Sequence, residues 1–420
     1  MPAVPVSAGP RRARVRLRDA GPTVFTQMSQ LAGLHGAINL GQGFPDTPGP
    51  SVVVDSAVAA LRAGHHQYPP VPGLPALREA IAAHQRGWYG IEWDPAREVV
   101  VTTGASEALA AALLALVGPG DEVIVLEPYY DSYAACVELA GATLVPVRLT
   151  PPAFTFDPAA LRAAVTPRTK VLLLNTPHNP TGTVLPPESL RQIAETARAH
   201  DLLVIADEVY EHLVYEGPHL PIATLPGMAE RTLTIGSAGK TFSFTGWKVG
   251  WATGPADLVE AVTAVKQYLS FSSGTPFQHA VAEALRLPPV RITALRDSLR
   301  ERRDRFVAGL RDIGFAVHVP QGTYFVTADI RPLGEADGLA FCRSLPARCG
   351  VAAVPNQVFY ADPAAGRPYV RFAFCKQQAV LDEALGRLAA LRSGSPPAST
   401  APFSSIASIA SILPTEEASS

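Results

Sequence analysis

The segment KVLLLNTPHNPTGTVLPPESLRQIAETARAHDLLVIAD, residues 170–207, decides the fold class of this chain. It begins with an apolar run at 170–174, continues with a helical pattern at 188–200 and ends with a second apolar run at 202–205. Strands that are apolar at every position are buried on both faces, as in a parallel sheet covered by helices. Because the same alternation of strand-like and helical patterns starts at residue 99, we predict an α/β fold with a mostly parallel central sheet.

The pattern changes after a long helical stretch at 287–311. Strand-like runs follow at 324–327, 350–354 and 369–374, with helical patterns at 338–344 and 378–392. This order predicts a second, smaller α+β domain. The predicted organisation is a flexible N-terminal arm at 1–20, an N-terminal segment of the small domain at 21–50, a large domain at 51–286, the C-terminal small domain at 287–392, and a disordered tail at 393–420.

Composition excludes several classes of function. The 420 residues carry a formal net charge of −2, and charged residues make up 17% of the chain, against about 25% in an average protein. A nucleic-acid partner is not expected, because tracking phosphates requires a basic excess. No apolar run is long enough to cross a membrane. The four cysteines, Cys136, Cys342, Cys349 and Cys375, form no C-x-x-C pair, which favours reduced thiols and a cytoplasmic location.

Both ends of the chain differ in composition from the rest. The N-terminal arm has five arginines between residues 11 and 18 but no apolar run after them, so it is not a secretory signal. The tail at 393–420 is rich in Ser, Ala and Pro and has no Lys or Arg, which is typical of disorder. The alternative is that its apolar patch, Ile406, Ile409, Ile412 and Leu413, docks on a partner or on the rest of the chain.

Two glycine-rich stretches resemble nucleotide motifs only superficially. The hexapeptide GSAGKT at 236–241 is two residues too short for a P-loop. Gly41 and Gly43 begin a possible dinucleotide fingerprint, but Pro45 interrupts it and Asp46 stands where a glycine is needed. We therefore do not predict a nucleotide site.

Seven motifs, taken together, point to one chemistry. They are NLGQGFPD at 39–46, QYPPVPGLPALREAIA at 67–82, GASEAL at 104–109, NTPHNPTG at 175–182, ADEVYEHL at 206–213, GSAGKTFSFTGWKVGW at 236–251 and YVRFAF at 369–374. The sequence resembles class I/II aminotransferases of fold type I, from about residue 24 to residue 391. Within them it is similar to the kynurenine, glutamine and methionine aminotransferase branch and to actinobacterial N-succinyldiaminopimelate aminotransferases.

The resemblance implies that the cofactor is pyridoxal 5′-phosphate. Lys240 would bind its aldehyde carbon and later move a proton between the substrate Cα and the cofactor. Asp207, at the carboxyl end of a predicted strand, would keep the ring nitrogen protonated. Tyr210 and Asn179 would donate hydrogen bonds to the phenolate oxygen, and Asn175 would shape the same turn. The alternatives are a surface lysine at 240 and a helix-capping Asp207.

For the cofactor phosphate, the resemblance implies a cradle of Gly104, Ala105, Ser106, Ser237 and Lys248. Residues 104–106 lie between the strand at 99–102 and a helix expected from Glu107, and helix N-termini bind anions. A helix cap is the alternative role for Ser106. Many relatives have Arg at the last position, and Lys248 keeps the charge without the two-pronged geometry.

Two aromatic residues are implied at the edges of the site. Tyr68 would reach the cofactor phosphate of a neighbouring subunit, which implies a homodimer with shared active sites. Tyr130 would stack on the cofactor ring, with its neighbour Tyr129 as the alternative.

The substrate α-carboxylate would bind to Arg371 through a two-pronged ion pair, with Asn179 beside it. Gly43 would let the backbone approach the same carboxylate, because it has no side chain. Three histidines, His178, His212 and His318, show no ligand spacing, and we interpret them as structural.

The predicted function is transfer of an amino group from an L-amino acid to a 2-oxo acid such as 2-oxoglutarate, in two half-reactions on one cofactor. N-succinyldiaminopimelate is the first candidate donor, and kynurenine, glutamine and methionine are alternatives. A β-eliminating C–S lyase would use the same residues. A cofactor-sensing regulator would need a DNA-binding module ahead of Leu40, where the preceding segment is too short. Residues 31–36 and 271–275 are expected to contribute to the pocket for the substrate side chain.

Overall fold

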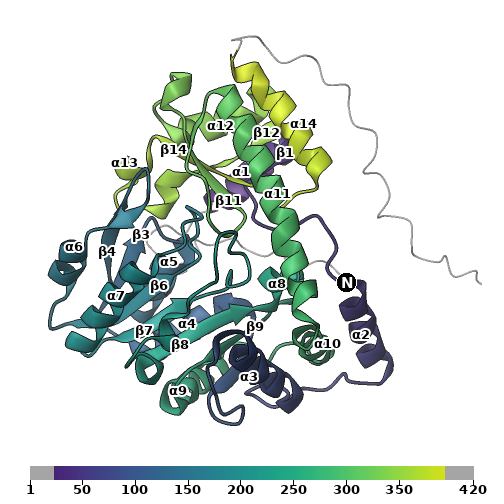
Figure 1. Cartoon of the computed structure of the whole chain (residues 1–420), viewed down its shortest axis with the longest axis vertical. Coiled ribbons are helices and arrows are strands. Elements are labelled where there is room, and N and C mark those ends of the chain that lie inside the picture. Colours follow the sequence, from purple (N-terminus) through teal and green to yellow (C-terminus); the bar gives the residue numbers. More distant parts are fainter. Residues whose placement is uncertain (1–22, 393–420) are drawn as a thin grey trace, which may run out of the picture.

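An eight-stranded sheet forms the centre of the larger part of the molecule (Figure 1). The computed structural model describes residues 23–392. The strands follow the spatial order β2 (Val99–Thr103), β9 (Val249–Thr253), β8 (Thr232–Ser237), β7 (Leu203–Asp207), β6 (Thr169–Asn175), β3 (Glu122–Glu127), β4 (Thr143–Thr150) and β5 (Thr155–Phe156). Neighbours from β8 to β4 are parallel, whereas β9 pairs antiparallel with β2 and β8, and β5 with β4. The predicted mostly parallel central sheet is confirmed.

Helices cover both faces of this sheet, which explains the continuous apolar runs. In β6, Val171 and Leu173 pack in one hydrophobic cluster while Leu172 and Leu174 pack in another. The first cluster includes α4 (Gly104–Leu116), α5 (Asp131–Ala140) and α9 (Ala256–Lys266), and the second includes α6 (Pro158–Ala164) and α7 (Pro187–Ala199). A third cluster, beside β2 and β9, includes α2 (Ser51–Arg62), α3 (Pro75–Tyr89) and α10 (Thr275–Leu285).

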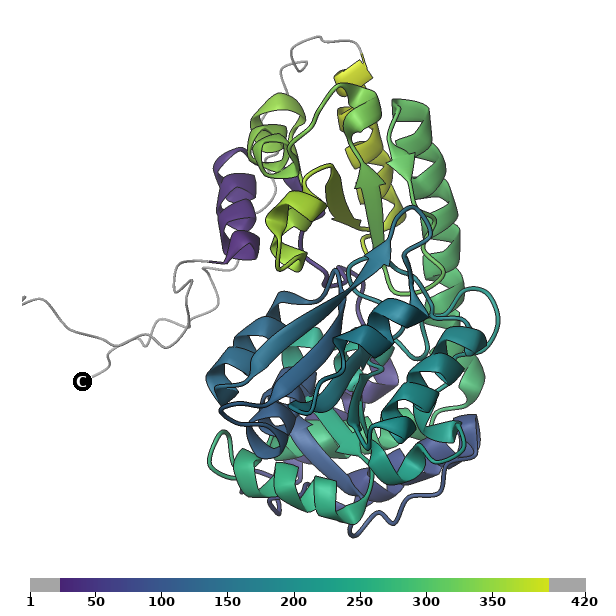
Figure 2. The same ribbon diagram turned by 90° about the vertical axis from the view of Figure 1, so that its left-hand side faces the viewer.

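The smaller part of the molecule combines segments from both ends of the described chain (Figure 2). Its four-stranded antiparallel sheet has the order β10 (Ala316–Val317), β11 (Phe325–Asp329), β14 (Tyr369–Ala373) and β13 (Val354–Pro355). A parallel pair joins β1 (Ile38–Asn39) to β12 (Val351–Ala352). The helices of this part are α1 (Val24–Leu34), α12 (Gly338–Cys349), α13 (Pro363–Gly366), α14 (Gln378–Leu388) and the long α11 (Pro289–Ile313), which runs between the two parts in Figure 1.

The structure differs from the sequence pattern at several elements. The strand predicted at 350–354 is divided into β12 and β13, because these two segments pair with different sheets. The helix predicted at 338–344 extends to Cys349 and contains Pro346. The sequence pattern does not predict β8 and β9, since glycines interrupt their apolar runs. Those glycines are needed because a Cβ at Gly236 would lie 2.3 Å from the Trp251 ring, and one at Gly250 would lie 2.6 Å from the backbone of α4.

The predicted arm at 1–20 and the tail at 393–420 lie outside the described residues, as does the apolar patch of the tail. The predicted limits of the large and small domains stay a prediction. Within residues 23–392, no helix has both the length and the apolar character needed to cross a membrane.

Candidate active site

A cavity of about 400 Å³ lies where the two parts of the molecule meet, at the carboxyl ends of β6 and β7. Open α/β sheets bind ligands at this edge. Asn175 and Asp207 are the last residues of those strands and line the cavity. The lining residues are Thr23, Phe25, Gln42, Gly43, Phe44, Ala105, Ser106, Leu109, Tyr130, Asp131, Asn175, Asn179, Asp207, Val209, Tyr210, Lys240, Phe325 and Arg371.

Lys240 is on α8 (Ala238–Thr241), a short helix that directly follows β8. Its Nζ donates a hydrogen bond to the Tyr324 hydroxyl at 2.9 Å, and that hydroxyl donates to the Gly43 carbonyl at 2.7 Å. Burial lowers the pKa of Lys240 to about 8, and Lys248 has only a smaller effect in the same direction. A lysine with this pKa is partly neutral near pH 8, so it can act as a nucleophile and as a base. The alternative of a surface lysine is therefore wrong.

Asp207 is a buried carboxylate with one strong donor. Its Oδ2 accepts a hydrogen bond from the Tyr133 hydroxyl at 2.5 Å, and its Oδ1 accepts one from the Val209 N–H at 3.4 Å. Burial raises the pKa of Asp207 to about 6, and the Tyr133 hydroxyl acts in the opposite direction. No helix follows this residue within 208–213, so the alternative of a helix cap is wrong. Asp207 therefore presents a carboxylate that is ionised near neutral pH.

Asn175 holds the turn that brings Asn179 into the cavity. Its Nδ2 donates to the Asp207 carbonyl at 2.8 Å, and its Oδ1 accepts from the Asn179 backbone N–H at 2.8 Å. Asn179 in turn accepts a hydrogen bond at Oδ1 from Arg371 Nη1 at 2.8 Å. The Nδ2 amide of Asn179 is therefore the donor that remains for a ligand, as the expected contact with a phenolate oxygen requires.

Arg371, on β14, is a buried cation that lacks an anionic partner. Its exposed fraction is 2%, its Nη2 donates to the Gly41 carbonyl at 3.0 Å, and its guanidinium carbon lies 4.0 Å from the centre of the Phe325 ring. Within the described residues it forms no ion pair, and its Nε has no hydrogen-bond partner. Burial lowers the pKa of Arg371 to about 10. Because buried charges are normally paired, this arrangement favours an anionic ligand.

Gly43 lines the cavity, and the structure adds a second reason for a glycine there, while the predicted approach of the backbone to the carboxylate stays a prediction. A Cβ at position 43 would lie 2.5 Å from the Phe325 ring. The missing side chain is therefore required by the packing of Phe325 against the backbone, whether or not a ligand is close. The Gly43 carbonyl also fixes the Tyr324 hydroxyl that contacts Lys240.

The expected phosphate cradle is partly assembled. Helix α4 starts at Gly104, three residues earlier than predicted, so residues 104–106 form its first turn. The cap alternative for Ser106 is wrong, because the N-cap is Thr103. Ala105 and Ser106 line the cavity, and Gly104 lies beside Lys248, whose Nζ would be 3.4 Å from a Cβ at that glycine. The residues at 104, 237 and 248 lie outside the set that lines the cavity.

The two aromatic residues expected at the edges lie in different places. Tyr130 lines the cavity at the N-terminus of α5, whereas Tyr129 is buried outside the lining, so the structure places the first of the two at the site. Tyr68 is 83% exposed and packs against Phe271, with 5.3 Å between ring centres. It does not reach the cavity of its own chain.

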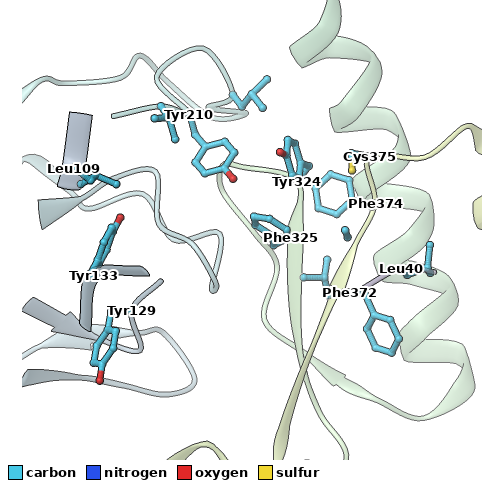
Figure 3. Packing of buried hydrophobic residues seen from close by; sticks show 14 of the residues in the cluster. Leu40, Leu109, Tyr129, Tyr133, Tyr210, Tyr324, Phe325, Phe372, Phe374 and Cys375 are labelled. Carbon is cyan, nitrogen blue, oxygen red and sulfur yellow. The ribbon is translucent and has the colours of Figure 1, made fainter. Parts of the chain in front are cut away.

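Several residues of the site are not predicted from the sequence, and four of them stand out. Tyr133 binds Asp207, Tyr324 binds Lys240, Phe325 packs on Arg371, and Asp131 lines the cavity. Figure 3 shows Tyr210, Tyr324 and Phe325 close together at the junction of the two parts. Their separation along the chain leaves no spacing signal that could identify them. The segment DSYAAC at 131–136, which contains Tyr133, predicts a helix and nothing about a site.

The cavity fits the cofactor that the resemblance implies. Pyridoxal phosphate needs an amine for its aldehyde, a carboxylate for its ring nitrogen and N–H donors for its phosphate. The lining offers Lys240 with a lowered pKa, the buried Asp207, and the first turn of α4. Arg371, a cation that lines the same cavity and forms no ion pair within the described residues, would suit a second anion such as the expected substrate carboxylate.

Comparisons with known proteins agree with this geometry. The family model "Aminotransferase class I and II" matches residues 35–388. A protein named "Probable N-succinyldiaminopimelate aminotransferase DapC" from Mycobacterium tuberculosis H37Rv is 55% identical over 388 residues, covering 90% of this chain and 98% of its own. The methionine aminotransferase of Escherichia coli K12 is 41% identical, covering 89% of this chain and 97% of its own.

Solved structures give the same result. The N-succinyldiaminopimelate aminotransferase of Mycobacterium tuberculosis superposes with a TM-score of 0.88 at 54% identity, covering 90% of this chain and 100% of its own. An aspartate aminotransferase variant of Thermus thermophilus superposes with a TM-score of 0.83 at 35% identity, covering 91% and 100%. The chain therefore belongs to the class I and II aminotransferase family, has the fold type I architecture of that family and is a pyridoxal phosphate-dependent enzyme.

Proposed function

We propose that this aminotransferase moves the amino group of N-succinyldiaminopimelate to 2-oxoglutarate. The observation that supports the reaction is the convergence of Lys240, Asp207 and Arg371 on one cavity. The choice of donor rests on the relative with 55% identity over nearly the whole chain. Kynurenine, glutamine and methionine stay as alternative donors. They rank lower, because the methionine and kynurenine aminotransferases are 41% and 39% identical to this chain.

The expected cofactor contacts divide among three groups of residues. Asp207 would hold the proton of the ring nitrogen, and Asn179 and Tyr210 would donate to the phenolate oxygen. Residues 104–106, Ser237 and Lys248 would bind the phosphate, and Tyr130 would cover the ring. When bound, pyridoxal phosphate supplies an aldehyde carbon that bonds to amines and a ring that withdraws electrons from the substrate Cα.

Lys240 performs the proton transfer in this proposal. Its Nζ, with a pKa lowered to about 8, would take the proton from the substrate Cα and deliver it to the cofactor carbon that carried the aldehyde, and would carry a proton in the opposite direction in the second half-reaction. The Tyr324 hydroxyl, 2.9 Å from Nζ, orients the amine, and the Gly43 carbonyl orients that hydroxyl. Proton transfer requires such positioning, since a displacement of 1 Å can cost about 100-fold in rate.

In this proposal, Arg371 binds the α-carboxylate of the substrate in both half-reactions. The amino acid and the oxo acid each carry a carboxylate next to the reacting carbon, and the fork of Arg371 is held by Asn179 and the Gly41 carbonyl. A carboxylate at this fork would gain charge-assisted hydrogen bonds from the buried guanidinium. One binding mode for both substrates supports a mechanism in which they occupy the site in turn.

We also propose a homodimer with shared active sites. Tyr68, Tyr268, Leu269 and Phe271 form an exposed apolar surface, with exposed fractions of 83%, 85%, 51% and 40%. Helix α2 packs against α10 nearby and exposes Val52, Val54, Val58 and Leu61. A second copy would cover this area and bring Tyr68 to the neighbouring cofactor phosphate. Light scattering of the holoenzyme should give the mass of a dimer.

We place the enzyme in the cytoplasm, in amino acid biosynthesis. All four cysteines are free thiols and buried, which suits a reducing compartment. The biosynthetic role follows from the proposed donor.

An amino-donor screen with 2-oxoglutarate as the acceptor tests the proposal. We expect glutamate to form from N-succinyldiaminopimelate with the highest kcat/KM, ahead of methionine, kynurenine and glutamine. Failure to use any acylated diamino acid would remove the proposed donor but leave the family intact. A parallel reaction without acceptor measures ammonia, which a β-eliminating lyase would release. The variant Lys240→Ala serves as the control and should lose turnover.

A further inference from the structure

Three metal-binding side chains lie together in the interior, outside the catalytic cavity. His84 is on α3, and Glu211 and His212 belong to the turn after β7. Their exposed fractions are 5%, 5% and 7%, and none of them lines the cavity. We interpreted His212 as structural because no other histidine lies near it in the sequence at ligand spacing. The fold brings His84 to it across 128 positions.

The three candidate ligand atoms form a triangle of the right size for a metal ion. His84 Nε2 and His212 Nε2 are 2.8 Å apart, and Glu211 Oε1 lies 4.0 Å from the first and 3.8 Å from the second. Three points with these separations lie on a circle with a radius of about 2.1 Å, which matches zinc bond lengths to nitrogen and oxygen. A tetrahedral zinc ion with bonds of about 2.0–2.1 Å separates two nitrogen ligands by about 3.3 Å, so binding requires the two imidazoles to move apart by about 0.5 Å from their 2.8 Å contact.

The charge balance of the cluster favours a cation. Glu211 is buried, and within the described residues its ion-pairing groups are only His84 and His212, at 4.0 and 3.8 Å. Tyr89 and Gln85 also hydrogen-bond to it, but both are neutral donors. Buried charges are normally paired or coordinate metals. No lysine or arginine in residues 23–392 forms an ion pair with this carboxylate.

A fourth side chain at the cluster, Gln85, has an amide oxygen, Oε1, without a hydrogen-bond partner among the described residues. Gln85 is 2% exposed, and its Nε2 lies 3.4 Å from Glu211 Oε2. Amide oxygens are acceptable ligands for divalent ions, so this buried group offers a fourth ligand beside the other three.

We propose that His84 Nε2, His212 Nε2 and Glu211 Oε1 bind one divalent transition-metal ion, foremost Zn²⁺, with Gln85 Oε1 or a water as the fourth ligand. Two imidazoles and a carboxylate are a typical zinc ligand set, whereas Ca²⁺ and Mg²⁺ require mainly oxygen ligands. The site is structural, because it lies outside the catalytic cavity. It ties α3 to the turn that follows Asp207 and contains Tyr210, so it stabilises the base of the active site.

The competing interpretation is a metal-free hydrogen bond between the two imidazoles. In that case one ring donates its N–H to the other, and added zinc has no effect on the folded protein. Metal binding by the native state alone raises the melting temperature. The two interpretations therefore predict different results for the same measurement.

The test uses the full-length holoenzyme without a histidine tag, treated with a chelator and dialysed free of unbound cofactor. Zinc is then added, and metal content is measured by mass spectrometry after gel filtration. We expect about one zinc per chain and a rise in melting temperature of about 3 °C when free zinc is a hundred times its Kd. Cobalt should produce the visible absorption bands of a four-coordinate ion.

Three conservative variants, His84→Gln, His212→Gln and Glu211→Gln, should each weaken zinc binding at least tenfold and abolish the thermal shift. The matched control is His65→Gln, because His65 and His279 form a more exposed imidazole pair, 4.1 Å between ring centres, that could bind zinc adventitiously. This variant should keep one zinc per chain. If one buried variant fails to fold, the other two and the cobalt spectrum of the unmodified chain decide.

The proposal is overturned if the unmodified chain retains less than about a tenth of a zinc ion per chain with an unchanged melting temperature. It is also overturned if His65→Gln removes the bound zinc, or if all three buried variants bind zinc as the unmodified chain does.

Discussion

Replacing Tyr133 by Phe should shift the acid side of the pH profile of this enzyme. The Tyr133 hydroxyl donates to Asp207 Oδ2 at 2.5 Å and is the largest influence that opposes the effect of burial on the pKa of Asp207. Hydrogen bonds to charged groups contribute about 1.5–3 kcal/mol, so losing this one should raise the pKa of Asp207 by about 1 to 2.

The sign of the effect follows from the role of Asp207. The carboxylate must be ionised to hold the proton of the cofactor ring. Its pKa is about 6 in the cofactor-free protein, and the protonated ring would lower it in the holoenzyme of both the unmodified chain and the variant. In the variant, protonation of Asp207 extends to higher pH, so kcat/KM should fall about tenfold or more at pH 6 and recover toward the unmodified value near pH 9.

The assay measures kcat/KM from pH 5 to pH 9 for the unmodified enzyme, Tyr133→Phe and the control Tyr129→Phe. Tyr129 is also buried, but its hydroxyl points away from that of Tyr133 in Figure 3. In the control Tyr129→Phe, the decrease of kcat/KM at acid pH should occur at the same pH as in the unmodified enzyme. A loss in Tyr133→Phe that is equal at every pH, or no loss at all, would refute the reasoning.

Three further predictions follow from buried contacts of the site. Burial raises the folded-state pKa of Asp207 from 3.8 to about 6, so the carboxylate destabilises the cofactor-free protein progressively between these two pH values and fully above the second. Asp207→Asn should therefore abolish transamination yet stabilise the cofactor-free protein at pH 8 by about 1–3 kcal/mol, with a much smaller gain at pH 4, as measured by urea unfolding. Replacing Arg371 by Lys should lower kcat/KM about 100-fold, because the ammonium cannot form the two-pronged pair; steady-state assays should show the loss for carboxylate substrates and little change for an amine donor without a carboxylate. Because a Cβ at Gly43 would lie 2.5 Å from the Phe325 ring, Gly43→Ala should destabilise the protein by about 1–3 kcal/mol, whereas Gly87→Ala, in open space on α3, should stabilise it by about 0.5–1 kcal/mol in the same unfolding assay.

Much of the fold is predictable from local patterns. The strands β3, β6 and β7 each contain an uninterrupted run of four apolar residues, so burial on both faces and a parallel sheet follow from the local pattern. Strand β2 has a shorter apolar run, and its antiparallel pairing with β9 is not encoded in that pattern. Strands β8 and β9 are not predictable in this way, because each has a glycine where another element approaches closely. The division of 350–354 into β12 and β13 depends on two pairing partners that are distant in sequence.

The residues of the site that belong to sequence motifs are predictable, and the isolated ones are not. Lys240, Asp207, Asn179 and Arg371 stand in motifs that are characteristic of the family, and the structure brings all four to one cavity. Tyr133 and Tyr324 carry no such signal, since an isolated tyrosine in a helix or before a strand has many roles. Their contacts with Asp207 and Lys240 arise only when α5 and the small part pack on the large sheet.

The covered parallel sheet, the family and the reacting groups follow from the amino-acid sequence. These properties depend on residues that lie close together in the chain or in fixed motifs. The hydroxyl that contacts Asp207, the need for a glycine at residue 43 and the meeting of His84 with Glu211 and His212 are visible only in the folded chain. These contacts join residues that are far apart in the chain. The pKa of Asp207 and the spacing of the three candidate metal ligands depend on burial and on distances in the folded structure, which no local sequence pattern encodes.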